Sequence, residues 1–320
     1  MRRNEAASGA GSVQIKKLFF IISEGEMKKI KDYLLLIKPS LSIMVVFSSV
    51  ISFLLTQGSE QYVMNRWTMI FLLFVGGMLV TGSANAINQV VEKDTDAMMK
   101  RTASRPVASG RMSVAEGWAF AIITGAAGVF ILGHYFNWLA AGLAAFSLFL
   151  YAFIYTPLKK VNSIAVLVGA VPGALPCLIG WAAGDGYLGT GGWVLFAFQF
   201  FWQFPHFWAI AWVAHKDYST AGFKLLPADK GPTKFTALQT ILYSLLLIPV
   251  TLAPFFIGMC SYENVSGIIS LSLIGLANLF MIGRCLTLYR KMDVASARQV
   301  MFGSYMYLPI VMLALLLSKV

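Results

Sequence analysis

Apolar positions along this chain gather into nine long stretches that are separated by short polar segments. The stretches cover residues 40–57, 67–88, 113–133, 136–155, 162–183, 191–212, 236–259, 264–284 and 300–318. Crossing a hydrocarbon core of about 30 Å takes about 20 predominantly apolar helical residues. The pattern therefore predicts an all-α fold, a polytopic bundle of nine transmembrane helices that forms one domain over residues 31–320.

The first 30 residues have a different character. Their only apolar run covers residues 18–22, and Glu24 and Glu26 follow it, which is unlike the apolar core of a secretory signal peptide. We expect residues 1–30 to form a disordered cytoplasmic tail. The sequence leaves open whether translation begins at Met1 or at Met27.

Composition agrees with a membrane protein. Hydrophobic residues make up 58% of the chain and charged residues 12%, whereas soluble domains carry about 25% charged residues. These values exclude a soluble globular domain and a disordered chain. The three cysteines, Cys177, Cys260 and Cys285, lie in or beside apolar stretches without zinc-ligand spacing, so we expect them to be core residues.

Charge is distributed unevenly between alternate loops. With nine spans, 23 of the 25 lysines and arginines fall on the N-terminal side of the membrane, and only Arg66 and Lys319 fall on the other. The positive-inside rule then places the N-terminus and the large loops in the cytoplasm and the C-terminus outside. The net charge of +11 is thus explained by basic cytoplasmic loops of a protein in the bacterial cell (inner) membrane. We therefore expect no nucleic acid partner.

One cytoplasmic loop carries acidic residues at a helical spacing. Asn88, Glu92 and Asp96 occur at i, i+4 and i+8, which places their side chains within about 80° of one helix face. Carboxylates near a membrane interface need a wet cavity, a partner or a metal, and Mg²⁺ takes such oxygen ligands together with substrate phosphates. Cations suited to phosphate oxygens follow directly: Lys100, Arg101 and Arg105. The loop predicts a Mg²⁺–diphosphate site, with an internally paired helix end as the alternative.

A second polar segment follows the sixth apolar stretch. His206 lies within the aromatic run from Phe200 to Trp208, and Lys216 and Asp217 come after it. If the helix continues, His206 and Asp217 lie on the same face three turns apart. His206 is either a buried site residue or a core histidine that donates to a backbone carbonyl freed by Pro205.

These motifs together resemble the UbiA-type intramembrane prenyltransferases. The stretch from Asn88 to Gly110, with Arg105-Pro106 inside it, resembles the first aspartate-rich motif of that superfamily, with Glu92 where Asp is common. The segments Tyr155-Thr-Pro-Leu-Lys-Lys, Trp202-Gln-Phe-Pro-His-Phe-Trp and Asp217-Tyr-Ser-Thr-Ala-Gly resemble the branch that farnesylates heme. Ala221 stands where the quinone branch usually has a second Asp.

The resemblance implies a bundle around a cavity that opens to the lipid bilayer, capped by cytoplasmic loops. It also implies a transferase that joins the farnesyl group of farnesyl diphosphate to a vinyl group of heme B, giving heme O, with Mg²⁺ as cofactor. Contact with heme A synthase or a terminal oxidase assembly would be a further partnership. A quinone-type or other lipid acceptor, and a transporter of an anionic substrate, remain as alternatives.

Each residue that matches these motifs receives an expected role from the resemblance. The catalytic and metal-binding set is Asn88, Glu92, Asp96 and Asp217. The set that neutralises the diphosphate is Lys100, Arg101, Arg105, Lys159, Lys160 and Lys216. The set that contacts heme is His206, Trp202 and Tyr155.

Overall fold

The structure is a computed structural model that describes residues 26–60, 62, 64–228 and 231–320. A helix over Glu26–Ile37 is followed, after a bend of 47°, by α2 (Pro39–Leu55). The longer helices that come next are α3 (Arg66–Val91), α5 (Val114–Tyr135), α6 (Trp138–Phe149), α8 (Ala165–Asp185), α9 (Thr190–Val213), α11 (Lys234–Phe256), α12 (Val265–Lys291) and α13 (Val294–Leu317). Short elements complete the chain: η1 (Gly58–Glu60), α4 (Lys93–Met98), the π-helix η2 (Leu150–Tyr155), α7 (Thr156–Leu158) and α10 (His215–Thr220).

Every predicted apolar stretch forms a helix, so the prediction of an all-helical polytopic bundle is confirmed. Each of the nine predicted stretches corresponds to a helix, although length and hydropathy alone single out fewer of them as spans. Within the described ranges, seven helices are long and apolar enough to cross a membrane, or eight if the bent pair before and including α2 forms one span. The helix outside this set is α9, whose 24 residues suffice in length but include two Gln, one His and one Pro that lower its mean hydropathy.

The prediction of a disordered tail is wrong for residues 26–30, because the helix Glu26–Ile37 includes them. Residues 1–25 of that tail lie outside the described residues.

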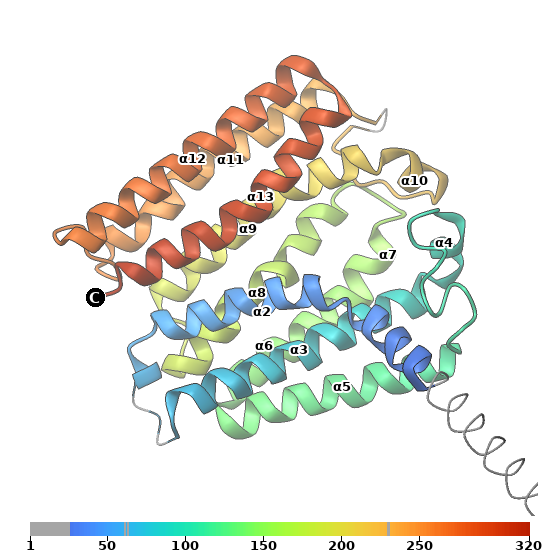
Figure 1. Ribbon diagram of the computed structural model, residues 1–320, viewed down its shortest axis with the longest axis horizontal. Coiled ribbons are helices and arrows are strands. Elements are labelled where there is room, and N and C mark those ends of the chain that lie inside the picture. Colours follow the sequence, from blue (N-terminus) through green and yellow to red (C-terminus); the bar gives the residue numbers. More distant parts are fainter. Residues whose placement is uncertain (1–25, 61, 63, 229–230) are drawn as a thin grey trace, which may run out of the picture.

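The long helices form a closed circuit of neighbours. Helix α8 packs against α2, α6 and α9, and α9 packs in turn against α11 and α13; α13 returns to α2. Helix α5 lies along α3 and α12 lies along α13, which places these pairs toward opposite sides of the bundle (Figure 1). Helices α2, α8, α9 and α13 thus enclose the centre of the molecule.

Small residues permit the closest approaches in this circuit. A Cβ atom added to Gly180 of α8 would lie 1.9 Å from the carbonyl oxygen of Ser49 in α2, and one added to Gly184 would lie 2.0 Å from Thr56 Oγ1. Side chains of any size would therefore push α2 and α8 apart.

The polar connections gather at one end of the bundle. Elements α4, α7 and α10 lie at the end remote from the C-terminus (Figure 1). We call residues 92–112, 156–161 and 214–228 at this end the cap. It covers the bundle centre from one side.

Candidate functional site

The two polar loops, distant in sequence, are in contact within the cap. Met99 packs with Ala221 and Phe223 in a buried apolar cluster. The guanidinium of Arg101 lies 5.6 Å from the centre of the Tyr218 ring, and its Nη2 is 3.4 Å from the Tyr218 hydroxyl. The structure therefore combines the loop after α3 and the loop after α9 into one surface.

Asn88, Glu92 and Asp96 keep the helical register that their spacing predicts, although α3 ends at Val91, α4 begins at Lys93 and Glu92 caps both helices. The amide of Glu92 donates to the Asn88 carbonyl at 3.0 Å, and the amide of Asp96 donates to the Glu92 carbonyl at 2.7 Å. Asn88 Nδ2 also donates to Glu92 Oε2 at 2.8 Å. All three side chains are buried.

Each of the two carboxylates is paired with a cation. Lys159 Nζ lies 2.5 Å from Glu92 Oε1 and donates to Asn88 Oδ1 at 3.0 Å. Arg105 Nη1 donates to both carboxylate oxygens of Asp96, at 2.7 and 2.6 Å. Burial raises the pKa of the Asp96 carboxyl, and the neighbouring Arg105 opposes this change. Both carboxylates therefore form internal pairs in the structure, and the Mg²⁺–diphosphate site stays a prediction.

The remaining predicted diphosphate ligands are less enclosed. Asp217 is half-buried in α10, and among the described residues its carboxylate forms no ion pair. Lys100, Arg101, Lys160 and Lys216 are exposed around the cap. No three His, Cys, Asp or Glu side chains converge as a metal site over the described ranges. The oxygen donors of Asn88, Glu92 and Asp96 nevertheless suit Mg²⁺ chemically, since this ion needs only one or two carboxylates plus substrate phosphates.

Lys159 links the cap to the interior. Its ammonium lies 4.7 Å from the centre of the Tyr155 ring and 5.6 Å from that of Phe223. Tyr155 ends the π-helix η2, a rare element that often marks functional sites. Its ring packs on Gly169 of α8, where an added Cβ would lie 2.6 Å from the ring. The glycine thus makes the space that Tyr155 occupies.

Beneath the cap lies a cavity of about 760 Å³ between α2, α3, α6, η2, α8, α9 and α13. This volume is within the range of about 300–1,000 Å³ that small-molecule sites have. The lining is mostly apolar and includes the three predicted heme contacts, Tyr155, Trp202 and His206. Polar side chains that sequence reasoning missed also line it: Lys38, Asn85, Tyr151, Gln199 and Gln203.

Of these missed residues, Lys38 had a detectable signal. It is a cation directly before Pro39 at the start of an apolar stretch. In the structure it adopts a left-handed backbone with φ 50°, which is uncommon for a residue other than glycine, and it occupies the bend before α2. Gln199 and Gln203 had no comparable signal, because a helical amide can equally face a neighbouring helix.

His206 is buried in an aromatic setting on α9. Its ring stacks on Trp202 with centroids 4.7 Å apart and meets the edge of Tyr305 at 4.7 Å. Its Nδ1 lies 2.7 Å from Ser304 Oγ. The alternative that this histidine donates to a carbonyl freed by Pro205 is therefore wrong.

The expectation that His206 and Asp217 share one helix face is also wrong. Helix α9 ends at Val213, and Ala214 has φ −96° and ψ 13°, so α10 is a separate short helix. Helix α10 therefore belongs to the cap and does not extend α9.

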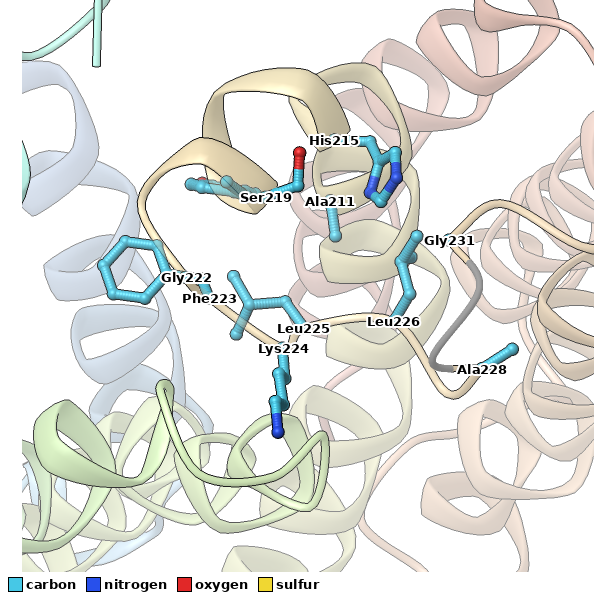
Figure 2. Close-up of a pocket in the computed structure, with 11 residues that line it drawn as sticks. Ala211, His215, Ser219, Gly222, Phe223, Lys224, Leu225, Leu226, Ala228 and Gly231 are labelled. Atoms are coloured by element: carbon cyan, nitrogen blue, oxygen red, sulfur yellow. The ribbon is translucent and has the colours of Figure 1, made fainter. Parts of the chain in front are cut away.

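A second, smaller pocket of about 360 Å³ lies in the loop after α10. Figure 2 shows His215 and Ser219 on one side of it and Lys224 on another. Phe223 lines this pocket and also lies over Lys159, so the pocket adjoins the cap.

Comparison with known proteins places these features in a wider context. Residues 45–307 match the UbiA prenyltransferase family. A protoheme IX farnesyltransferase of Cytophaga hutchinsonii is 43% identical over 292 residues, which cover 90% of this chain and 97% of that protein.

Two solved structures have the same fold. A digeranylgeranylglyceryl phosphate synthase in membranes aligns with a TM-score of 0.72 at 19% identity, covering 91% of this chain and 98% of that one. A UbiA homologue from Archaeoglobus fulgidus bound to GPP and Mg²⁺ aligns with a TM-score of 0.67 at 16% identity, covering 89% and 99%.

Proposed function

The chain belongs to the UbiA prenyltransferase family, and we propose that it transfers the farnesyl group of farnesyl diphosphate to a vinyl group of heme B (protoheme IX), giving heme O. The observation that carries this proposal is the placement of a buried histidine and its aromatic neighbours in an apolar cavity directly below a polar cap. The cap suits a diphosphate and the cavity suits two large apolar groups. The relative from Cytophaga hutchinsonii bears the corresponding name.

The cap binds the diphosphate end of the donor. Lys159 and Arg105 supply cations beside the acids, and exposed lysines and Arg101 surround them. Glu92 and Asp96 hold Mg²⁺, with the Asn88 amide oxygen as a further donor; when bound, the ion offsets charge on the leaving diphosphate. Lys159 and Arg105 can then turn from the acids to phosphate oxygens, because a guanidinium or ammonium binds either anion.

The reaction conserves atoms and electrons. The C–O bond of farnesyl diphosphate breaks, and its electron pair leaves with the diphosphate. The π electrons of the heme vinyl group form the new C–C bond, after which the remaining cation takes up water and releases a proton. Cations positioned in the cap stabilise the developing negative charge, and the apolar cavity keeps water away from the allylic cation until the bond forms.

We further propose that the cap faces the cytoplasm and that the C-terminus lies outside. The clustering of α4, α7 and α10 at one end of the bundle (Figure 1) supports this orientation together with the distribution of basic residues. The expected contact with heme A synthase or a terminal oxidase assembly stays part of this proposal.

The proposal is tested with purified protein, farnesyl diphosphate, Mg²⁺ and either heme B or 4-hydroxybenzoate as acceptor. We expect mass spectrometry to detect heme O only with heme B, and chelation of Mg²⁺ to abolish it. Prenylated hydroxybenzoate in place of heme O would contradict the assigned acceptor and indicate a quinone-type enzyme. Release of diphosphate without any prenylated product would contradict both.

A further inference from the structure

His206 shares its hydrogen bond with a serine on another helix. Ser304 of α13 is fully buried, and its Oγ lies 2.7 Å from His206 Nδ1. The same hydroxyl donates to the carbonyl oxygen of Met301 at 2.7 Å.

The number of protons available in this contact determines the tautomer of the His206 imidazole. A serine hydroxyl has one proton and two lone pairs, and the Met301 carbonyl can only accept. Because the Ser304 proton goes to Met301, the bond between Ser304 and His206 needs a proton from His206 Nδ1. The imidazole therefore carries its proton on Nδ1 and a lone pair on Nε2.

Ser304 also fixes the orientation of the ring. Its backbone carbonyl accepts a hydrogen bond from Trp202 Nε1 at 2.9 Å, and Trp202 stacks on His206 with an interplanar angle of 15°. Tyr305, the next residue on α13, meets the imidazole at 79°. One residue of α13 thus positions both the histidine and its stacking partner.

The other nitrogen of the ring is available to a ligand. His206 lines the cavity, and over the described part of the chain Nε2 has no hydrogen-bond partner. A neutral imidazole with one nitrogen anchored by a donated hydrogen bond is the form in which histidine ligates metals.

We propose that Ser304 is a positioning residue that holds His206 in the Nδ1–H tautomer, so that Nε2 coordinates the iron of the heme substrate. This inference rests on the proposed heme acceptor. Replacing a group that hydrogen-bonds a metal-bound histidine lowers metal affinity about 10- to 100-fold. We therefore expect Ser304→Ala to weaken heme binding about tenfold or more.

The first test titrates purified variants with heme B and follows absorption and electron paramagnetic resonance spectra. Ser304→Ala is expected to lose the imidazole ligation signature as His206→Ala does, while affinity for farnesyl diphosphate is unchanged. Ser304→Thr keeps the hydroxyl and is expected to restore ligation. Ser270→Ala is the matched control, because Ser270 is a buried serine that donates to the Ala314 carbonyl outside the cavity lining. Heme spectra and heme affinity of Ser304→Ala that match those of the wild-type protein would overturn the inference.

A second test needs no variant at Ser304 and therefore holds even if Ser304→Ala fails to fold. The chain has three histidines, so ¹⁵N-histidine labelling gives few imidazole signals, and His206→Ala assigns one of them. We expect a protonated Nδ1 and an unprotonated Nε2 in the heme-free protein. The opposite tautomer would overturn the inference, even if the wild-type protein makes heme O. Absence of heme O from the wild-type protein would instead contradict the proposed function.

Discussion

Lys159 is the residue on which the polar contacts of the cap converge. It pairs with Glu92, donates to Asn88 and lies over the rings of Tyr155 and Phe223. Removing one partner of a buried ion pair costs about 3–5 kcal/mol, because the other charge is left uncompensated. Lys159 is therefore expected to support both the fold of the cap and the binding of diphosphate.

For this reason Lys159→Met should lower the thermal unfolding midpoint as well as turnover. Lys160→Met is the control for stability alone, since Lys160 is exposed. In the double variant Lys159→Met with Glu92→Gln, stability should recover in part, because no buried carboxylate is left unpaired, whereas activity should not. Differential scanning fluorimetry in detergent measures the first effect. An unchanged midpoint in Lys159→Met would show that the pair does not stabilise the cap.

The acids themselves are predicted to serve the reaction as well as the fold. Asp96→Asn and Glu92→Gln should each lower turnover at least about tenfold, a loss of ~1.4 kcal/mol in transition-state stabilisation. Asp94→Asn is the matched control, because Asp94 is an exposed acid in the same short helix. Steady-state formation of heme O at saturating Mg²⁺ checks this. Wild-type turnover in both variants would contradict a role in the reaction and leave the two acids as structural partners of Lys159 and Arg105.

At the scale of elements, the close contact between α2 and α8 requires residues without a side chain in α8, such as Gly180. The Cβ that alanine would add at Gly180 meets the backbone of Ser49, which cannot move aside without shifting α2. Helix α2 also carries cavity-lining residues such as Met44 and Ser49. A displacement of this helix should therefore change both stability and the shape of the cavity.

Gly180→Ala is accordingly expected to destabilise the protein and to reduce heme affinity. Gly275→Ala on α12 provides the comparison, because an added Cβ there meets nothing within 4 Å and alanine favours a helix by up to about 1 kcal/mol. Thermal unfolding and heme titration of the two variants test the idea. Equal stability of both would mean that α2 relaxes away from α8 without cost.

At the scale of the whole molecule, the orientation in the membrane can be tested at the two ends of the bundle, since the cap lies at one end and the C-terminus at the other (Figure 1). Met98 in α4 and Val320 at the C-terminus are 59% and 64% exposed and lie at opposite ends (Figure 1). The native cysteines are all buried, so they interfere little with labelling. These positions suit single reporter cysteines.

Cysteine at position 98 should react with a membrane-impermeant maleimide only after the cytoplasmic side is opened, and cysteine at position 320 should react in intact cells. This result is expected because basic residues such as those around the cap favour the cytoplasmic side. Labelling of both positions from the same side would contradict the proposed topology, because it requires an even number of crossings between positions 98 and 320.

Local sequence by itself determined which segments become helices and which loops carry the candidate site residues. Apolar runs of about 20 residues leave a membrane protein few choices, because backbone polar groups in lipid must be satisfied within the segment. The positions of Asn88, Glu92 and Asp96 on one helix face likewise followed from local periodicity. The weakest local signal was that of α9, whose polar and aromatic residues reflect what it faces in the bundle.

Only the tertiary structure decided which residues meet. The pairing of Glu92 with Lys159, the bond of His206 to Ser304 and the position of Lys38 at the cavity join segments from different helices. Periodicity says which face a residue occupies but not which helix lies opposite, since many apolar faces are interchangeable in sequence. The choice among them depends on close fits such as that of Gly180 against Ser49, which exist only once the helices have packed.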